Sequence, residues 1–206
     1  MSDVSPLVID YSAFPEPHVD LPSRSSEGGA HAVLAGGCFW CTEAVYRAVE
    51  GVIDVVAGYT GGTSETANYR DVCSGRTGHA EAIRVTFDPS KTTFGQILKL
   101  FFSIAHDPTQ PDGQGSDLGA QYRSAIFFAD EEQRRIAELY IAQLNEATVF
   151  RRPIATTLEP LLEFFEAEEA HQNYAARNPS QPYIRAVALP KVEKLRKHMP
   201  TVVAKV

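Results

Sequence analysis

Two cysteines, Cys38 and Cys41, lie three residues apart in the stretch AVLAGGCFWCTEAVYRAVEG and are the first side chains that point to chemistry. Phe39 and Trp40, the only tryptophan of the chain, stand between them. Thiols at this spacing fit a redox pair, half of a metal site, or one working thiol beside a bystander. The elements that position the two cysteines must distinguish these alternatives.

The residues around Cys38 predict a strand, a sharp turn and then a helix. HAVLA is a short apolar run, and Gly36-Gly37 ends it. Cys38 is therefore expected at a helix N-terminus, where free N–H groups and the helix dipole favour a thiolate. We expect its pKa to lie below the usual value of about 8.5 and the thiol to be reactive rather than a small core residue. Phe39 and Trp40 would then form an apolar slot for a group such as a methyl, although such aromatics usually pack in a core.

A carboxyl group stands on the apolar face of a second predicted strand, HAEAIRVTFD. With a period of two residues, Glu81 shares one face with four other side chains: His79, Ile83, Val85 and Phe87. Burial there would raise the pKa of Glu81 and keep it protonated near neutral pH. The pattern alone leaves open that Glu81 lies close enough to the strand end to reach water.

The remaining segments predict an α+β domain. Strands are expected at 52–62, 77–89 and 123–130, with a further strand-like run from 154. Helices are expected at 92–107, with Pro108 after the end, and at 130–146, 168–179 and 189–200. Because these elements do not form a regular βαβα series, we expect a two-layer sandwich with helices packed around a mixed sheet. Long segments without periodicity, 59–78, 106–123 and 171–190, are typical of functional loops and could converge on one site.

Length, composition and charge restrict the function classes. The chain has 206 residues, a formal net charge of −7 and 22% charged residues, which fits one globular catalytic domain over 31–206. Residues 1–30, rich in proline and without periodicity, predict a loosely ordered N-terminal arm. No basic cluster indicates nucleic-acid binding, and no apolar run indicates a membrane span. Three cysteines and no signal-peptide pattern favour a cytoplasmic protein with reduced thiols.

Five blocks of the sequence resemble the peptide methionine sulfoxide reductase A family (MsrA). They are GGCFWCTEA, YRDVCSGRTGHAEAIRVTFDP, DLGAQYRSAIFF, EAHQNYAARNPSQPY and LPKVEKLRK, and together they cover roughly residues 31–199. The resemblance implies an α/β two-layer fold, with a ferredoxin-like core, and reduction of methionine-S-sulfoxide, free or in proteins. It implies a protein-repair enzyme, which we expect to be a monomer that needs an external thiol such as thioredoxin and no metal or organic cofactor.

The resemblance also implies a role for each matching position. Cys38 would be the nucleophile that becomes a sulfenic acid, and Glu81 would be the acid. Tyr69 and Tyr122 would donate their hydroxyls to the sulfoxide oxygen. Phe39 and Trp40 would form a pocket for the S-methyl group, and Asp117 would be the family's site aspartate. This set makes chemical sense, because hydrogen bonds or a proton on the sulfoxide oxygen make its sulfur open to attack.

The sequence differs from many family members because it lacks a C-terminal cysteine that would reduce the sulfenic acid. Members with a similar C-terminal block commonly carry a cysteine after Pro-Tyr, but Ile184 stands there and no cysteine follows Cys73. Our hypothesis is that Cys41 resolves Cys38, with thioredoxin as the final reductant. Two alternatives stay open: Cys73, which is expected to be a packed loop residue, and direct attack by an external thiol.

Two rival functions use the same cysteines. A thioredoxin-like disulfide oxidoreductase would also carry the Cys38-Cys41 pair, but it would fit a chain of about half this length. A zinc-held binding module would use Cys38, Cys41, Cys73 and His79, yet structural zinc sites usually show two paired ligand sets.

Overall fold

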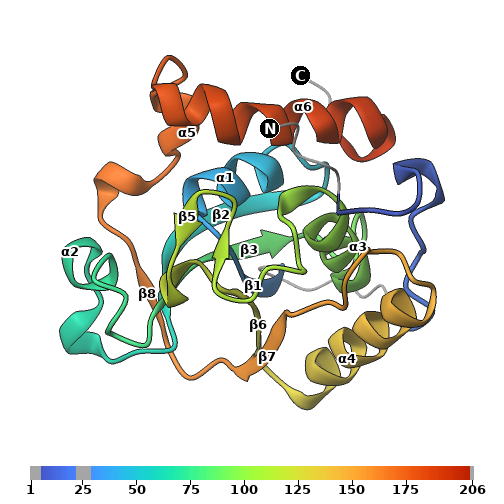
Figure 1. The fold of residues 1–206 in the computed structure, drawn as a ribbon, viewed down its shortest axis with the longest axis horizontal. Coiled ribbons are helices and arrows are strands. Elements are labelled where there is room, and N and C mark those ends of the chain that lie inside the picture. Colours follow the sequence, from blue (N-terminus) through green and yellow to red (C-terminus); the bar gives the residue numbers. More distant parts are fainter. Residues whose placement is uncertain (1–5, 22–28, 205–206) are drawn as a thin grey trace.

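The computed structural model describes residues 6–21 and 29–204, and its centre is one six-stranded sheet (Figure 1). The strands are β1 (Ala30–Gly36), β2 (Val52–Thr60), β3 (Ala80–Phe87), β6 (Ser124–Phe128), β7 (Thr157–Pro160) and β8 (Phe164–Glu166). Their order is β7-β6-β1-β3-β2-β8, and only the β6–β7 pair is parallel. A separate hairpin joins β4 (Gly113–Gln114) to β5 (Asp117–Leu118). The expected α+β class with a mixed sheet is confirmed.

Four helical segments pack around this sheet, and several shorter ones lie in the loops. The longer helices are α1 (Phe39–Tyr46), α3 (Phe94–Leu100), α4 (Glu131–Glu146) and α6 (Leu189–His198). The π-helical turn η3 (Phe101–Ala105) follows α3, and the π-helical turn η6 (Ile184–Ala188) precedes α6. The short helices are α2 (Tyr69–Val72), α5 (Tyr174–Arg177) and the 3₁₀ turns η1 (Tyr11–Ala13), η2 (Ser64–Thr66), η4 (Ala120–Tyr122), η5 (Glu169–His171) and η7 (Pro200–Val202). In the chain, α1 joins β1 to β2 and α3 lies between β3 and β6, which gives a β-α-β-β-α-β succession.

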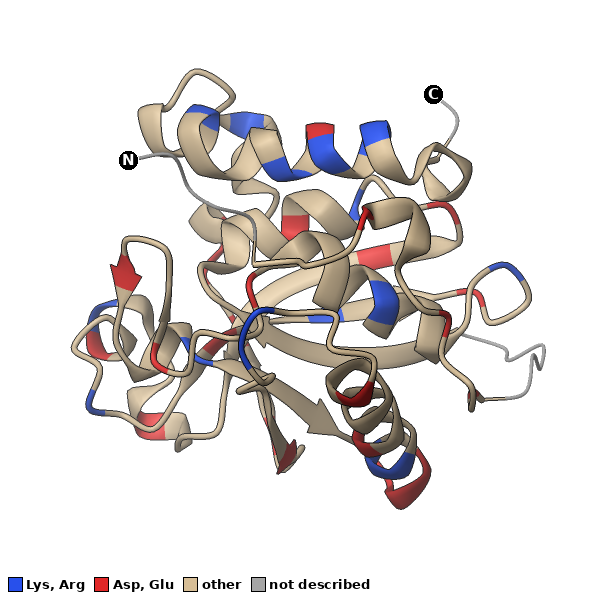
Figure 2. Ribbon diagram, turned by 45° about the vertical axis from the view of Figure 1, so that its right-hand side comes forward, with Lys and Arg blue, Asp and Glu red and all other residues tan. Residues whose placement is uncertain are grey.

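Capping side chains set where two of these helices begin. Thr93 accepts a hydrogen bond from the N–H of Gln96 at the start of α3, and Asp130 accepts one from the N–H of Gln133 at the start of α4. α1 lies against the sheet and α6 packs on α1 (Figure 1). Figure 2 shows Lys and Arg residues gathered along α6, while Asp and Glu residues occur on α4 and in several loops.

The core has two unequal parts, because the sheet is covered on both faces. The larger cluster lies between the sheet and the helices, and it includes Leu34, Val45, Ile83 and Val85. The smaller cluster lies on the other face, where Leu161 and Phe164 cover small side chains such as Ala80 and Ala82. The first half of β3 is therefore buried on both faces, which places Glu81 deep in the domain.

The N-terminal segment differs from the expectation of a loosely ordered arm. Within residues 6–21, Leu7 and Phe14 are buried in the main core, and the carbonyl of Pro15 accepts a hydrogen bond of 2.7 Å from Tyr140 Oη. Asp20 accepts another from the N–H of Gly95 at 2.7 Å. Isolated apolar anchors of this kind produce no periodicity, so the sequence pattern does not reveal them. Residues 1–5 and 22–28 lie outside the described part of the chain.

None of the helices in the described residues is both long and apolar enough to cross a membrane.

Candidate active site

One pocket of about 240 Å³ brings together the side chains that the sequence singled out. Seven predicted residues line it: Cys38, Phe39, Trp40, Tyr69, Glu81, Asp117 and Tyr122. They come from the start of α1, from β3, from the β4–β5 hairpin, and from α2 and η4, which lie in two of the expected loops. Gln181 and Tyr183 also line the pocket, although sequence reasoning did not select them. Tyr183 belongs to the Pro-Tyr block, in which only Ile184, the residue in place of a cysteine, led to a prediction.

A glycine turn places Cys38 at the N-cap of α1. Gly37 has φ +85°, and a Cβ atom there would lie 2.5 Å from Cβ of Gln114, so the turn requires glycine. The N–H of Cys41 donates to the carbonyl of Cys38 at 3.1 Å and closes the first helical turn. Cys38 is 8% exposed and reaches the pocket, whereas Cys41, at N3 of the same turn, is 1% exposed.

Glu81 lies at the bottom of the pocket and does not reach water. It is 2% exposed, and its Oε2 accepts a hydrogen bond of 3.0 Å from the N–H of Phe39. Burial raises the pKa of Glu81 to about 8, and the nearby charges of Asp117 and Cys41 act in the same direction. This carboxyl is therefore mostly protonated at neutral pH and can donate a hydrogen bond or a proton.

The two thiols interact, and this changes the expectation for Cys38. The contact with Cys41, burial and the charge of Glu81 raise the pKa of Cys38 above its usual value. The pKa of Cys41 falls to about 7, chiefly because Cys38 donates to it and secondarily because of the positive charge of Lys191. The expected low pKa of Cys38 is thus wrong for the free enzyme, because the helix terminus favours an anion on the pair and Cys41 holds it.

Neighbouring residues fix the two pocket tyrosines. Tyr69 begins α2, and its N–H donates to Glu168 at 2.9 Å; Glu168 also accepts a hydrogen bond of 2.8 Å from Tyr59 Oη. Tyr122 lies on η4 directly after the turn at Gly119. Burial raises the pKa values of Tyr69 and Tyr122, so both hydroxyls remain protonated donors at neutral pH.

A polar chain leads from Cys41 to the pocket. The Cys41 thiol donates to Tyr183 Oη at 3.7 Å, and the Tyr183 hydroxyl donates to Asp117 Oδ2 in a short hydrogen bond. Lys191, whose Nζ donates to the carbonyl of Ala105 at 2.7 Å, supplies the positive charge that favours a Cys41 thiolate. Cys73 differs from both other cysteines because it is exposed and does not line the pocket.

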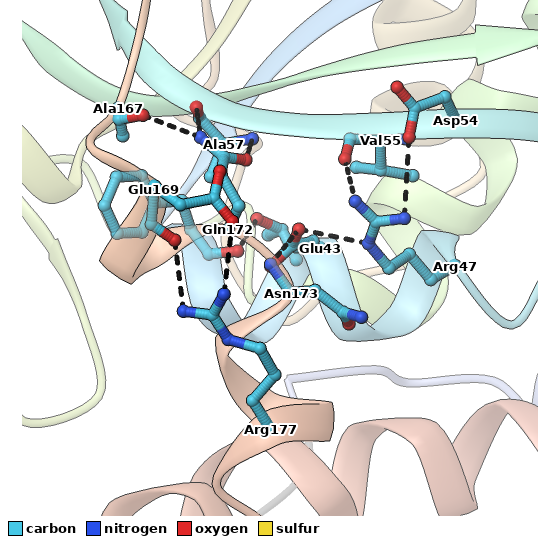
Figure 3. A network of polar contacts seen from close by, with 12 residues as sticks. Glu43, Arg47, Asp54, Val55, Ala57, Ala167, Glu169, Gln172, Asn173 and Arg177 are labelled. Carbon is cyan, nitrogen blue, oxygen red and sulfur yellow. Dashed lines mark hydrogen bonds and ion pairs between the residues drawn. The ribbon is translucent and has the colours of Figure 1, made fainter.

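A network of hydrogen bonds joins α1 and β2 to residues 167–177, next to the aromatic side of the pocket; Figure 3 shows this network. Trp40 stacks on Tyr174 with ring centroids 3.9 Å apart and an interplanar angle of 11°. Glu43, on α1, accepts a hydrogen bond of 2.8 Å from the N–H of Asn173, and Gln172 bonds to the backbone of β2 at Ala57. None of these supporting residues was selected from the sequence, since buried polar contacts between distant segments leave no periodic signal.

All three cysteines are free, and across residues 6–21 and 29–204 no group of three or more His, Cys, Asp and Glu side chains is arranged to hold a metal ion.

Comparisons with known proteins give one consistent family. The sequence model described as "Peptide methionine sulfoxide reductase" matches residues 30–202. The chain is 51% identical over 179 residues to the peptide methionine sulfoxide reductase MsrA of Deinococcus radiodurans, covering 85% of this chain and 86% of that one. It is 48% identical over 184 residues to MsrA 2 of Synechocystis sp., covering 88% and 86% respectively.

Solved structures show the same likeness. Methionine sulfoxide reductase A of Corynebacterium diphtheriae matches with a TM-score of 0.65 and 34% identity, over 84% of this chain and 86% of that one. Reduced Mxr1 of Saccharomyces cerevisiae matches with a TM-score of 0.69 and 33% identity, over 77% and 91% respectively. The thioredoxin-like alternative is not favoured. The chain belongs to the peptide methionine sulfoxide reductase family, and it is an oxidoreductase that reduces methionine sulfoxide.

Proposed function

We propose that this reductase acts on the S epimer of methionine sulfoxide, free or in proteins, through a sulfenic acid on Cys38. One observation carries the proposal: the buried Glu81 carboxyl, with a pKa of about 8, lines the same pocket as the Cys38 thiol. A sulfoxide needs this combination, because its sulfur becomes electrophilic only when its oxygen receives a proton or strong hydrogen bonds.

In the first step, Cys38 Sγ attacks the sulfoxide sulfur while Glu81 gives its proton to the sulfoxide oxygen. The hydroxyls of Tyr69 and Tyr122 donate to that oxygen, and Phe39 and Trp40 enclose the S-methyl group. The resulting OH group passes to Cys38 as the sulfur–oxygen bond of the substrate breaks. The sulfoxide is reduced by two electrons to methionine, and Cys38 is oxidised by two electrons to a sulfenic acid.

The Cys38–Cys41 pair supplies its own base for this attack. The pair gains one negative charge as the pH rises through about 7, and the lower pKa of Cys41 favours that charge on Cys41. As Cys38 begins to bond to the substrate, its proton moves to Cys41. Cys38 thus becomes nucleophilic when substrate is present, without a free thiolate facing the pocket in the resting enzyme.

In the second step, Cys41 attacks the Cys38 sulfenic acid and forms a disulfide. The thiol proton of Cys41 leaves along Tyr183 to Asp117, and the hydroxide released from Cys38 takes up a proton to become water. The N-cap and N3 positions of the pair support this assignment, because an N-cap side chain folds back toward N3. Two further points support it: Ile184, at the position where the family resemblance leads us to expect a resolving cysteine, is fully buried, and Cys73 is exposed.

An external dithiol then reduces the disulfide, and we propose thioredoxin for this role. No metal or organic cofactor takes part in these steps. Since one chain forms the whole pocket, we propose that the enzyme acts as a monomer. Three free cysteines fit the reducing cytoplasm.

The purified enzyme tests the proposal with each epimer of methionine sulfoxide separately, with dithiothreitol as reductant. We expect methionine from the S epimer only. Preferred reduction of the R epimer would overturn the substrate assignment, and faster reduction of insulin than of sulfoxide would overturn the reaction itself.

A further inference from the structure

The indole of Trp40 is oriented by a segment that lies outside the pocket. Besides its stacking on Tyr174, Trp40 lies against the ring of His171, with centroids 5.7 Å apart and an interplanar angle of 22°. Both partners belong to residues 167–177. The position of this segment therefore determines the tilt of the pocket wall.

Gln172 is the first anchor of this segment. Its side-chain amide takes the place of a further strand residue beside β2: Oε1 accepts from the N–H of Ala57, and Nε2 donates to the carbonyls of Ala57 and Ala167, each at 2.9 Å (Figure 3). Two of these hydrogen bonds fix the segment to β2, and the third, to Ala167, braces the segment internally.

Glu43 is the second anchor and connects the segment to α1. It is 1% exposed, and its Oε1 accepts hydrogen bonds from the N–H of Asn173 at 2.8 Å and from Nε of Arg47 at 3.0 Å (Figure 3). Asn173 has φ +50°, in the left-handed region, and this turn brings Tyr174 back onto Trp40. Glu43 lies three residues after Trp40, so both side chains occupy the same side of α1.

Stability alone does not account for this buried carboxylate. Within the described residues its Oε2 has no hydrogen-bond partner, and burying a charged group with an unsatisfied oxygen costs free energy. An apolar side chain would fill the same space, but it would leave the N–H of Asn173 unbonded and Tyr174 unanchored.

We propose that Glu43 and Gln172 are positioning residues that set the width of the methyl slot by holding Tyr174 against Trp40. This inference rests on the proposed role of Trp40 as a wall of that slot. A slot of fixed width accepts the S-methyl group and rejects a larger substituent; one extra methylene in an apolar pocket is worth roughly 10- to 200-fold in discrimination.

The test compares kcat/KM for the S-sulfoxides of methionine and ethionine, which differ by one methylene on sulfur. We expect the wild-type enzyme to prefer the methyl compound at least about tenfold. Glu43→Ala and Gln172→Ala should each reduce this preference at least threefold, mainly through a higher KM for methionine sulfoxide. Glu43→Gln keeps an oxygen that can accept from the N–H of Asn173, so this variant should retain most of the preference for the methyl compound. Emission from Trp40, the only tryptophan, should shift in the alanine variants.

The matched control is Glu169→Gln, which changes a carboxylate on the same segment that bonds to Arg177 and not to α1. Its methyl preference should equal that of the wild type. An unchanged preference in folded Glu43→Ala would overturn the inference. If that variant does not fold, Tyr174→Ala removes the stacked ring without altering a buried charge, and an unchanged preference there would overturn it equally.

Trp40→Leu separates this inference from the proposed function. If this variant keeps the wild-type preference, the methyl slot is wrongly assigned and the inference falls with it. If Trp40→Leu loses the preference while Glu43→Ala and Tyr174→Ala retain it, only the positioning role is wrong.

Discussion

Cys38 and Cys41 lie on one turn of α1, yet their surroundings differ in every respect that matters for chemistry. Cys38 opens into the pocket beside a neutral acid and two tyrosine hydroxyls. Cys41 is closed off from solvent and faces Tyr183 and the charge of Lys191. The first setting exposes a sulfur to substrate, and the second stabilises an anion that substrate cannot reach.

The difference shows that the thiol accessible to substrate need not be the thiol with the lower pKa. A helix N-terminus favours an anion near both sulfurs, but the partners of each sulfur decide where the charge resides. Two buried glutamates show the same rule. Within the described residues Glu81 has no cation at hydrogen-bonding distance, which suits its proposed role as an acid, whereas Glu43 bonds to Arg47, which suits its proposed role as an anchor.

Removing the accessible thiol should have the largest effect. Cys38→Ser is expected to lower kcat/KM for methionine sulfoxide at least about 10³-fold, because Cys38 has the only sulfur that lines the pocket among residues 6–21 and 29–204. Steady-state assays with dithiothreitol measure this loss. Retention of more than a few per cent of the activity would show that another residue is the nucleophile.

Removing the neutral acid should be nearly as harmful and should change the pH profile. Activity of the wild type should fall as pH rises through about 8, where Glu81 loses its proton, and as pH falls below about 7, where the thiol pair becomes fully protonated. Glu81→Gln should lower kcat/KM about 10²- to 10³-fold. It should also abolish the alkaline decline, since an amide does not titrate. The same alkaline decline in the variant would assign it to another group.

Removing the Cys41 thiol should slow steady-state turnover more than it slows formation of the first equivalent of methionine. Cys41→Ser is expected still to release about one equivalent of methionine per chain, at a lower rate because the base for Cys38 is lost, and then to turn over with thioredoxin at least about tenfold more slowly than the wild type. A rapid-quench burst experiment separates these two phases. Full thioredoxin-driven turnover in this variant would mean that an external thiol reduces the sulfenic acid directly.

The third cysteine should matter least. Cys73 is exposed and lies outside the pocket, so Cys73→Ser should leave thioredoxin-driven kcat within about twofold of the wild type. A large loss of turnover, with the first equivalent of methionine still formed, would transfer the resolving role from Cys41 to Cys73.

Local patterns predicted most of the fold, and long-range contacts explain what they missed. The period of β3 indicated that Glu81 lies on the apolar face but left its burial open, and the glycine turn indicated Cys38 at a helix start. The pKa order of the two thiols did not follow, because it depends first on the direction of the hydrogen bond between them and then on Lys191 and Tyr183, which lie far along the chain. The packing of Leu7 and Phe14 and the anchoring by Gln172 had no periodic signal either.

The central claim is that the two thiols act in sequence on one turnover, and a thiol count tests it most directly. The fully reduced enzyme receives one equivalent of methionine-S-sulfoxide without any reductant, and free thiols are titrated under denaturing conditions. We predict the loss of two thiols per chain in the wild type and of one in Cys41→Ser. Loss of only one thiol in the wild type, with methionine formed, would contradict the account.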